Sequence, residues 1–147
     1  MFGTTLKGRT AQVMGDPDQP HSYSYTLDVA AALITLATAP GATGRIWHLP
    51  VPETHTTREV VERVYALAGR RTRLFAAGAT TLRLYGLVKP AMREYLHTLY
   101  QFTDRWVVDD SQFRGAFGTP TTSLDDALAT TLQWYAAARD TAKETTR

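Results

Sequence analysis

The stretch from His21 to Tyr25 carries side chains that are suited to acid–base chemistry. His21, Tyr23 and Tyr25 stand at every second position, so an extended backbone would place an imidazole and two phenols on one side. Imidazole and phenol groups can move protons during a reaction. We therefore expect this stretch to contact a ligand, with His21 and Tyr25 as candidate catalytic residues and Tyr23 as a candidate substrate-binding residue.

A second stretch offers polar groups at helical spacing. Residues 93, 97 and 100 would bring a cation, an imidazole and a phenol to one helix face. Arg93 is a candidate catalytic residue here, and Glu94, His97 and Tyr100 are candidates for substrate binding. The alternative is that the tyrosines of this stretch are core aromatics with polar tips.

Other reactive residues fit chemical motifs less well. Tyr85 and Lys89 form a literal Tyr-x-x-x-Lys pair, whose ammonium group would favour the phenolate. No nucleotide-binding motif accompanies the pair, so we interpret it as a half-buried tyrosine beside a solvated lysine. The four histidines share no spacing typical of a metal site, and no serine lies in a nucleophile-elbow motif.

Composition excludes several classes of protein. The chain has 147 residues, a length typical of one domain, and no apolar run approaches a membrane span. It contains no cysteine, which excludes disulfides, thiol catalysis and cysteine-ligated metals. The net charge is +2, but its one basic cluster, residues 70–73, follows a glycine that ends a predicted helix. We therefore expect a soluble cytoplasmic protein that contacts neither nucleic acid nor membrane.

The pattern of residues predicts strands that alternate with helices in the first half, and mostly helices in the second. Strands are expected at residues 10–14, 22–25, 45–50 and 74–75, with a short extended piece at 106–108. Helices are expected at residues 28–39, 56–68, 80–102, 110–118 and from 123 onward. This order indicates an α/β layer at residues 1–78 followed by a helical lobe at residues 79–147, within one domain.

Local signals fix several helix ends. Thr56 and Glu59 form a capping-box pattern, and Gly69 is the expected C-cap of that helix. The helical stretch 80–102 should break at Lys89-Pro90, with the proline opening the second piece. Ser123 should cap the last helix, and Asp109 or Asp110 the one before it.

The order of these segments resembles the C-terminal half of an extended short-chain dehydrogenase/reductase, and in particular the NAD-dependent epimerase/dehydratase-like proteins. The resemblance covers essentially the whole chain and runs through "GDPDQPHSYSYTLDVAAAL", "GRIWHLP", "TTREVVERV" and "RWVVDDSQFRGAFGTPTTSLDDALATTLQWY". Asp28 stands where the family has an acidic residue before an Ala-rich helix, and residues 47–49 match a strand beside the nucleotide-binding sheet. The closing section matches at Asp109, Ser111, Phe113, Gly118, Pro120, Leu124, Trp134 and Tyr135.

The resemblance implies a partial Rossmann-type layer, its last strands and helices, followed by a helical substrate lobe. The family's Gly-rich cofactor turn and its catalytic Tyr-x-x-x-Lys pair belong to the preceding part and are not recognisable in this sequence. It also implies that this chain alone binds no cofactor, and that NAD or NADP would bind only if a partner supplies the missing half. The sheet would present an open edge at residues 23–26 or 45–49, which a second copy or another chain must cover.

Two functions follow, and we leave both open. The chain could be the substrate-binding half of an epimerase/dehydratase-like enzyme, unable to act as an NAD-dependent oxidoreductase alone. Alternatively, it could be a repurposed stand-alone protein, either a cofactor-free cyclase, isomerase or lyase or a binding protein for a hydrophobic small molecule. A third possibility is a non-catalytic interaction module, but no motif in the sequence supports it. We therefore favour a role in enzymatic chemistry.

Overall fold

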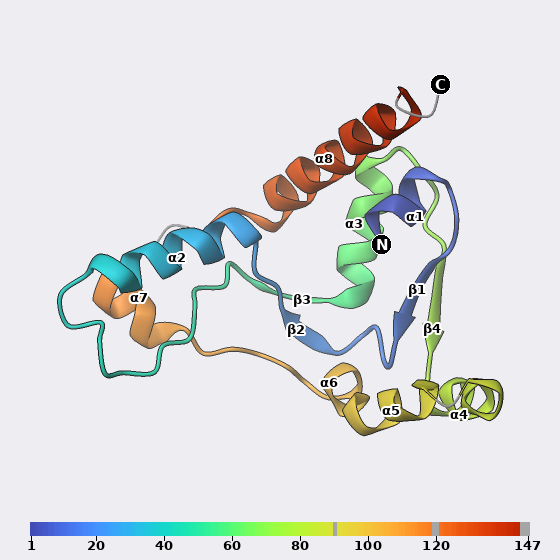
Figure 1. Ribbon diagram of the computed structural model, residues 1–147, viewed down its shortest axis with the longest axis horizontal. Helices are drawn as coiled ribbons and strands as arrows, with labels where there is room; N and C mark the ends of the chain where they lie inside the picture. Colours follow the sequence, from blue (N-terminus) through green and yellow to red (C-terminus); the bar gives the residue numbers. More distant parts are fainter. Residues whose placement is uncertain (90, 119–120, 145–147) are drawn as a thin grey trace.

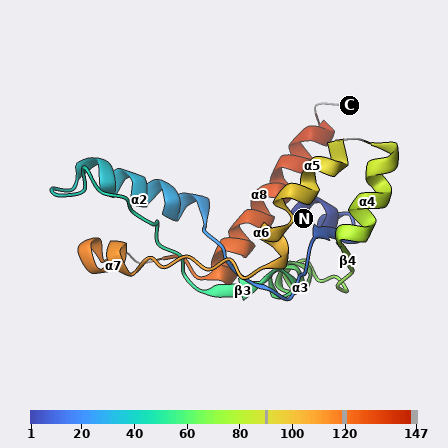
Figure 2. The same cartoon turned by 90° about the horizontal axis from the view of Figure 1, so that it is seen from below.

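The computed structural model describes residues 1–89, 91–118 and 121–144, with residues 91–93, 140 and 142–144 described by their backbone alone. The chain is elongated, and helices α2 (Thr26–Thr38) and α7 (Ser111–Phe117) lie together at one end in both views (Figures 1 and 2). The remaining helices and the strands gather toward the other end. Extended segments of chain connect the two ends.

The main core forms where helices pack against a small parallel sheet. Strand β1 (Ala11–Met14) pairs in parallel with β4 (Leu74–Ala77), with Ala11 opposite Leu74. Helix α3 (Thr57–Leu67) packs one face on this sheet through Val61 and Tyr65. Its other buried side chains meet helix α8 (Leu124–Glu144) and the short helix α1 (Phe2–Leu6). The sequence predicted both strands and both long helices, and these predictions are confirmed.

A second sheet is antiparallel and smaller. Strand β2 (Pro20–Ser22) pairs with β3 (Thr54–Thr56), and Trp106 joins the other edge of β2 through an isolated bridge. The backbone N–H of Ser22 donates to Trp106 at 2.9 Å, and Trp106 donates back to Pro20 at 2.9 Å. The predicted strand at residues 22–25 is therefore wrong in its placement. β2 ends at Ser22 because Ser22 pairs with Thr54, where its partner strand β3 begins.

Helix α3 begins where the sequence predicts. The Thr56 hydroxyl accepts a hydrogen bond from the backbone N–H of Glu59 at 3.1 Å, and the Glu59 carboxylate accepts one from the N–H of Thr56 at 3.1 Å. These reciprocal bonds make a complete capping box. Gly69 follows the helix with φ +62°, the left-handed conformation expected just past a helix end.

The helical stretch after β4 is broken as predicted. Helix α4 (Ala79–Val88) ends before Lys89, and α5 (Ala91–Thr98) and α6 (Tyr100–Thr103) follow. Pro90, which was expected to open the second piece, lies outside the described residues. The Asp16 N–H donates to the carbonyl of Phe102 at 2.9 Å, so the end of β1 is tied to α6.

The predicted strand at residues 45–50 is wrong, because no neighbouring strand pairs with it in the described part of the chain. The segment is extended without being part of a sheet. Helix α7 lies beside it and ends at Gly118, whose φ is +55°. The Asp109 carboxylate accepts the N–H of Ser111 at 3.0 Å at the start of α7, whereas Asp110 stands at the N-cap position without a side-chain bond to the helix backbone.

The α/β fold class is confirmed, since the chain combines a small parallel sheet with many helices. The division into an α/β part at 1–78 and a helical part at 79–147 stays a prediction. Among the described residues, no helix is both long enough and apolar enough to pass through a membrane.

Candidate functional site

The first predicted group, residues 21–25, lies only partly in a strand, because β2 ends at Ser22. His21 lies in β2 opposite His55 of β3, and the rings of His21 and Tyr23 are 6.3 Å apart. The Tyr23 hydroxyl is 2.7 Å from the Thr57 hydroxyl, and burial of the ring raises the pKa of Tyr23 above its ordinary value. Tyr23 therefore helps to hold the start of α3, which limits its freedom to contact a substrate.

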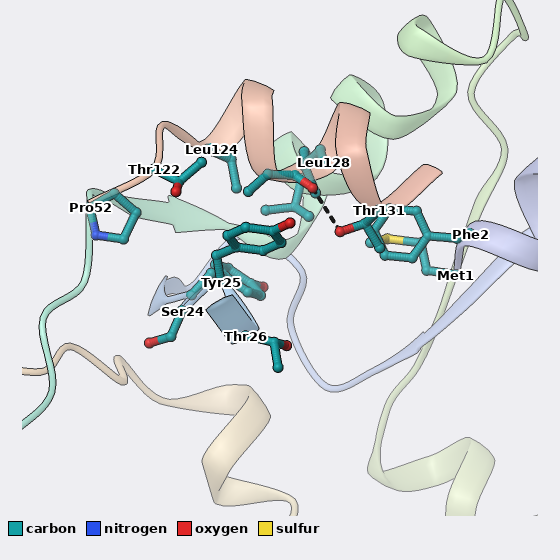
Figure 3. Close-up of a pocket in the computed structure, with 13 residues that line it drawn as sticks. Met1, Phe2, Ser24, Tyr25, Thr26, Pro52, Thr122, Leu124, Leu128 and Thr131 are labelled. Carbon is teal, nitrogen blue, oxygen red and sulfur yellow. Dashed lines mark hydrogen bonds between the residues drawn. The ribbon is translucent and has the colours of Figure 1, made fainter. Parts of the chain in front are cut away.

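Tyr25 occupies the N-cap position of α2 and reaches into an apolar pocket of about 240 Å³ (Figure 3). Figure 3 shows its ring facing Leu124 and Leu128 of α8. The other lining residues come from residues 1–2 and 23–26, from the segment before β3, from α3, from the segment before α8 and from α8 itself: Met1, Phe2, Tyr23, Ser24, Thr26, Pro52, Val60, Thr122, Ala127 and Thr131. Of the first predicted group, the structure thus brings Tyr23 and Tyr25 into one pocket, and His21 does not line it.

The second predicted group lies elsewhere. Glu94 and His97 of α5 are exposed, and Tyr100 at the start of α6 is 53% exposed. The side chain of Arg93 lies outside the described residues. None of the described residues of this group lines the Tyr25 pocket, so the structure does not bring the two groups together there. The roles assigned to His21, Tyr25 and Arg93 in catalysis and to Tyr23, Glu94, His97 and Tyr100 in binding stay predictions.

A buried histidine between two carboxylates was missed by the sequence reading. His55 is 8% exposed, with Nδ1 at 3.2 Å from Glu59 Oε2 and Nε2 at 3.0 Å from Glu53 Oε2. The hydrogen bonds from Thr56 and His55 hold the pKa of Glu59 below its ordinary value. The spacing Glu-x-His-x-x-x-Glu, from Glu53 to the capping-box residue Glu59, could have indicated that His55 lies between two carboxylates. Among the described residues, no three histidines or carboxylates are arranged to hold a metal ion.

The extended segment at residues 45–51 is held on one side by side chains. The Asp110 carboxylate accepts the N–H of Val51 at 2.8 Å, and Arg114 donates to both the Asp110 carboxylate and the carbonyl of Val51. The Trp47 ring packs against Phe113 and Phe117, with ring centroids 6.2 and 5.0 Å away. These contacts fix the position of the segment from the α7 side.

The backbone of this segment is otherwise unpaired. Among the described residues, no backbone N–H or C=O of residues 46–49 makes a hydrogen bond. Ile46 is 86% exposed. An extended segment with free backbone groups is a ready template for pairing with another strand.

The Tyr85 and Lys89 pair is exposed. Tyr85 is 60% exposed, and the two side chains line a shallow hollow on α4 together with Leu84 and Val88. The hollow is nearly apolar. We find no geometric support there for a catalytic role.

Comparison with known proteins relates the fold to one class of enzymes. No family model matches the chain, and no curated protein matches its sequence. Among solved structures, the UDP-glucuronic acid 4-epimerase of Bacillus cereus in complex with UDP-glucuronic acid and NAD is 14% identical, with a TM-score of 0.71. The dTDP-glucose 4,6-dehydratase of Bacillus anthracis is 15% identical with a TM-score of 0.69, and the UDP-glucose 4-epimerase of Thermus thermophilus is 19% identical with a TM-score of 0.70.

The alignments cover most of this chain and a minor part of the neighbours. They span 93%, 95% and 93% of this chain, but 38%, 38% and 39% of the three neighbours. The resemblance in segment order is thereby confirmed at the level of the fold. The chain has the fold of the C-terminal part of NAD-dependent epimerases and dehydratases.

Proposed function

We propose that this chain is the substrate-side part of an epimerase/dehydratase-like protein. In this proposal, the strands that complete the nucleotide-binding layer come from residues outside the chain. NAD or NADP binds only when that layer is present. The solved neighbours act on sugar nucleotides or are bound to them, which makes a nucleoside-diphosphate sugar the substrate class to test.

The observation that carries the proposal is the unpaired segment at residues 46–49. Free N–H and C=O groups on an exposed extended segment form a template for pairing with another strand, and folded proteins normally pair or cover such an edge. Asp110 and Arg114 fix the segment at Val51, and Trp47 anchors it on α7. The segment is therefore already extended and positioned for a strand that the described residues do not provide.

Helix α2 adds a second argument. Ala32 is its one buried residue, whereas Leu27, Leu33 and Ile34 are 64%, 53% and 66% exposed. A helix with this many exposed large apolar residues normally packs against a sheet or another helix. Because α2 runs into the segment at residues 45–49, one added layer of strands could cover both.

The Tyr25 pocket supports a second candidate function. An apolar pocket with a phenol in its wall is the kind of site that a stand-alone binding protein or cofactor-free catalyst for a hydrophobic molecule would use. In that case the open segment would be covered by a second copy of the chain.

The experiment combines nucleotide titration with light scattering on a size-exclusion column. We expect the chain alone to bind neither NAD nor NADP in calorimetry, and to associate through the open segment in a concentration-dependent way. Ile46→Lys should reduce this association, because a charge on an exposed edge opposes strand pairing. Leu87→Lys is the matched control, since Leu87 is 72% exposed on α4, away from the segment.

The outcomes separate the two candidates. Binding of NAD or NADP by the chain alone would contradict the proposal. A stable homo-oligomer of fixed mass that is indifferent to nucleotide would favour the stand-alone protein. Equal effects of the two lysine substitutions would show that residues 46–49 are not the associating edge.

A further inference from the structure

The Tyr25 pocket has the features of a binding site for a small aromatic molecule. It is formed by segments that are far apart in the sequence: residues 1–2, residues 23–26, Pro52, Val60 of α3, Thr122 and the first turns of α8 (Figure 3). No lining side chain is an aspartate, glutamate, lysine or arginine, and Met1 carries an α-ammonium group. A cationic ligand would therefore lose its hydration there without gaining an anionic partner from the lining residues, which disfavours cations on energetic grounds.

The size of the pocket suits a ligand of one or two rings. An apolar cavity of about 150 Å³ in another protein stays dry and binds benzene. The pocket here has about 240 Å³, so it has room for a ligand of about ten non-hydrogen atoms. Leu124, Leu128 and Val60 supply aliphatic surface, and Phe2 and Tyr25 supply aromatic rings.

Three hydroxyl groups in the pocket wall, those of Ser24, Tyr25 and Thr26, have no partner among the described residues, and of these three residues only Tyr25 is not exposed. The Tyr23 hydroxyl is paired with Thr57, and the Thr131 hydroxyl donates to the carbonyl of Ala127 at 2.7 Å. The Thr122 hydroxyl donates to the Asp28 carboxylate at 2.7 Å. Tyr25 is half-buried, and its hydroxyl makes no hydrogen bond within the described part of the chain. A tyrosine whose ring is packed in a pocket normally finds a hydrogen-bond partner.

We propose that this pocket binds a one- or two-ring aromatic ligand that carries a hydroxyl or carbonyl group, which forms a hydrogen bond with the Tyr25 hydroxyl. The proposal does not depend on the open segment at residues 46–49. It specifies the ligand class for the second candidate function and rests on that candidate's use of this pocket. Its failure would remove the pocket's support for the stand-alone protein and would leave the substrate-side proposal unaffected.

The test uses two naphthalene probes with the full chain: 2-naphthol and naphthalene. Binding is followed by the fluorescence anisotropy of the probe. We expect 2-naphthol to bind about three- to tenfold more tightly than naphthalene, the range of one hydrogen bond. In Tyr25→Phe, the affinity for 2-naphthol should fall to that for naphthalene, while the affinity for naphthalene stays the same.

A second substitution tests the location. Ala127→Phe places a ring in the pocket wall and should weaken binding of 2-naphthol at least tenfold. Ala137→Phe is the matched control, because Ala137 is exposed further along the same helix and does not line the pocket. Tyr85→Phe is the control for Tyr25→Phe.

Several results would overturn the proposal. These are the absence of saturable binding by the wild-type chain, an advantage of 2-naphthol that persists in Tyr25→Phe, and equal binding by Ala127→Phe and Ala137→Phe. If Ala127→Phe does not fold, the comparison of the two probes on wild type and Tyr25→Phe decides the question alone.

Discussion

Replacing Asp110 by alanine tests whether α7 holds the extended segment at residues 45–51 in place. The Asp110 carboxylate accepts hydrogen bonds from the Val51 N–H and the Arg114 guanidinium, each at 2.8 Å. Val51 is 8% exposed, so its N–H would be left without a partner in a site that water scarcely reaches. Arg114 would keep its contact with the Val51 carbonyl but lose its ion pair.

The expected cost follows from these contacts. A hydrogen bond to a charged group contributes about 1.5–3 kcal/mol, and an unsatisfied buried N–H costs about 1–3 kcal/mol. The Asp110 side chain is 13% exposed and that of Arg114 is 40% exposed, so solvent weakens the ion pair and the backbone bond dominates. We expect Asp110→Ala to lower the free energy of unfolding by about 2 kcal/mol, and Asp110→Asn by about half as much, since the amide oxygen still accepts one bond.

The assay is urea unfolding followed by the fluorescence of Trp47, in a background with Trp106→Phe and Trp134→Phe. Trp47 packs against Phe113 and Phe117, so its emission reports the contact between the segment and α7. A loss of about 2 kcal/mol lowers the urea midpoint by about 1 M. Asp125→Ala is the control, because its pair with Arg63 is exposed and should contribute less than about 1 kcal/mol. A midpoint for Asp110→Ala within experimental error of the control would refute the reasoning.

Three further predictions concern other elements. Gly15→Ala should destabilise the chain by more than about 2 kcal/mol in urea unfolding, because a Cβ at this position would lie 2.3 Å from the carbonyl oxygen of Phe102. Gly41 has a similar positive φ but open space around it, so the control Gly41→Ala should cost about 1 kcal/mol. Equal costs for the two variants would contradict the close approach of Gly15 to Phe102. Thr56→Ala should lower the free energy of unfolding by about 1 kcal/mol, because it removes the capping box of α3. Thr54 is exposed, so the control Thr54→Ala should cause no measurable change. Equal urea midpoints for the two variants would show that the cap is not formed in solution. Hydrogen bonds hold the pKa of Glu59 and of Asp109 below their ordinary values, so the stabilisation they give is present above about pH 4.5 and is lost as pH falls through their folded-state pKa values. The melting temperature should therefore fall below about pH 4.5, and by less in Glu59→Gln, whereas an identical pH dependence in the variant would exclude Glu59 as a contributor.

Local signals in the sequence predicted the helix ends well. The capping box at Thr56 and Glu59, the glycine after α3 and the break at Lys89 each depend on residues that are neighbours along the chain. Ser123 likewise accepts the N–H of Asp126 at the start of α8, as expected. These features could be predicted because their hydrogen-bond partners lie within four residues.

Features that depend on distant partners were predicted less well. Residues 45–50 have the composition of a strand, but a strand forms only where a partner lies beside it, and the described part of the chain provides none. The strand expected at residues 22–25 ends at Ser22, because its partner β3 has only three residues. In both places the residue types indicate an extended backbone, but they do not show which other segment, if any, pairs with it.

The candidate site shows the same division. Tyr23 and Tyr25 do line one pocket, but through the turn into α2 and the packing of α8, and not through strand alternation. His55 was missed because its burial depends on β2, β3 and two carboxylates meeting in space. The second group, on α5 and α6, stands away from the pocket.

Hydrogen exchange of the backbone amides at residues 46–49 tests the central claim most directly. In the monomeric chain, the account predicts that these amides exchange at nearly the rate of an unstructured peptide, whereas the amides within α3 are protected. On association with the layer that completes the sheet, the same amides should become protected. Strong protection of residues 46–49 in the monomer would mean that the segment is already paired within the chain, and would contradict the proposal that other residues complete the sheet.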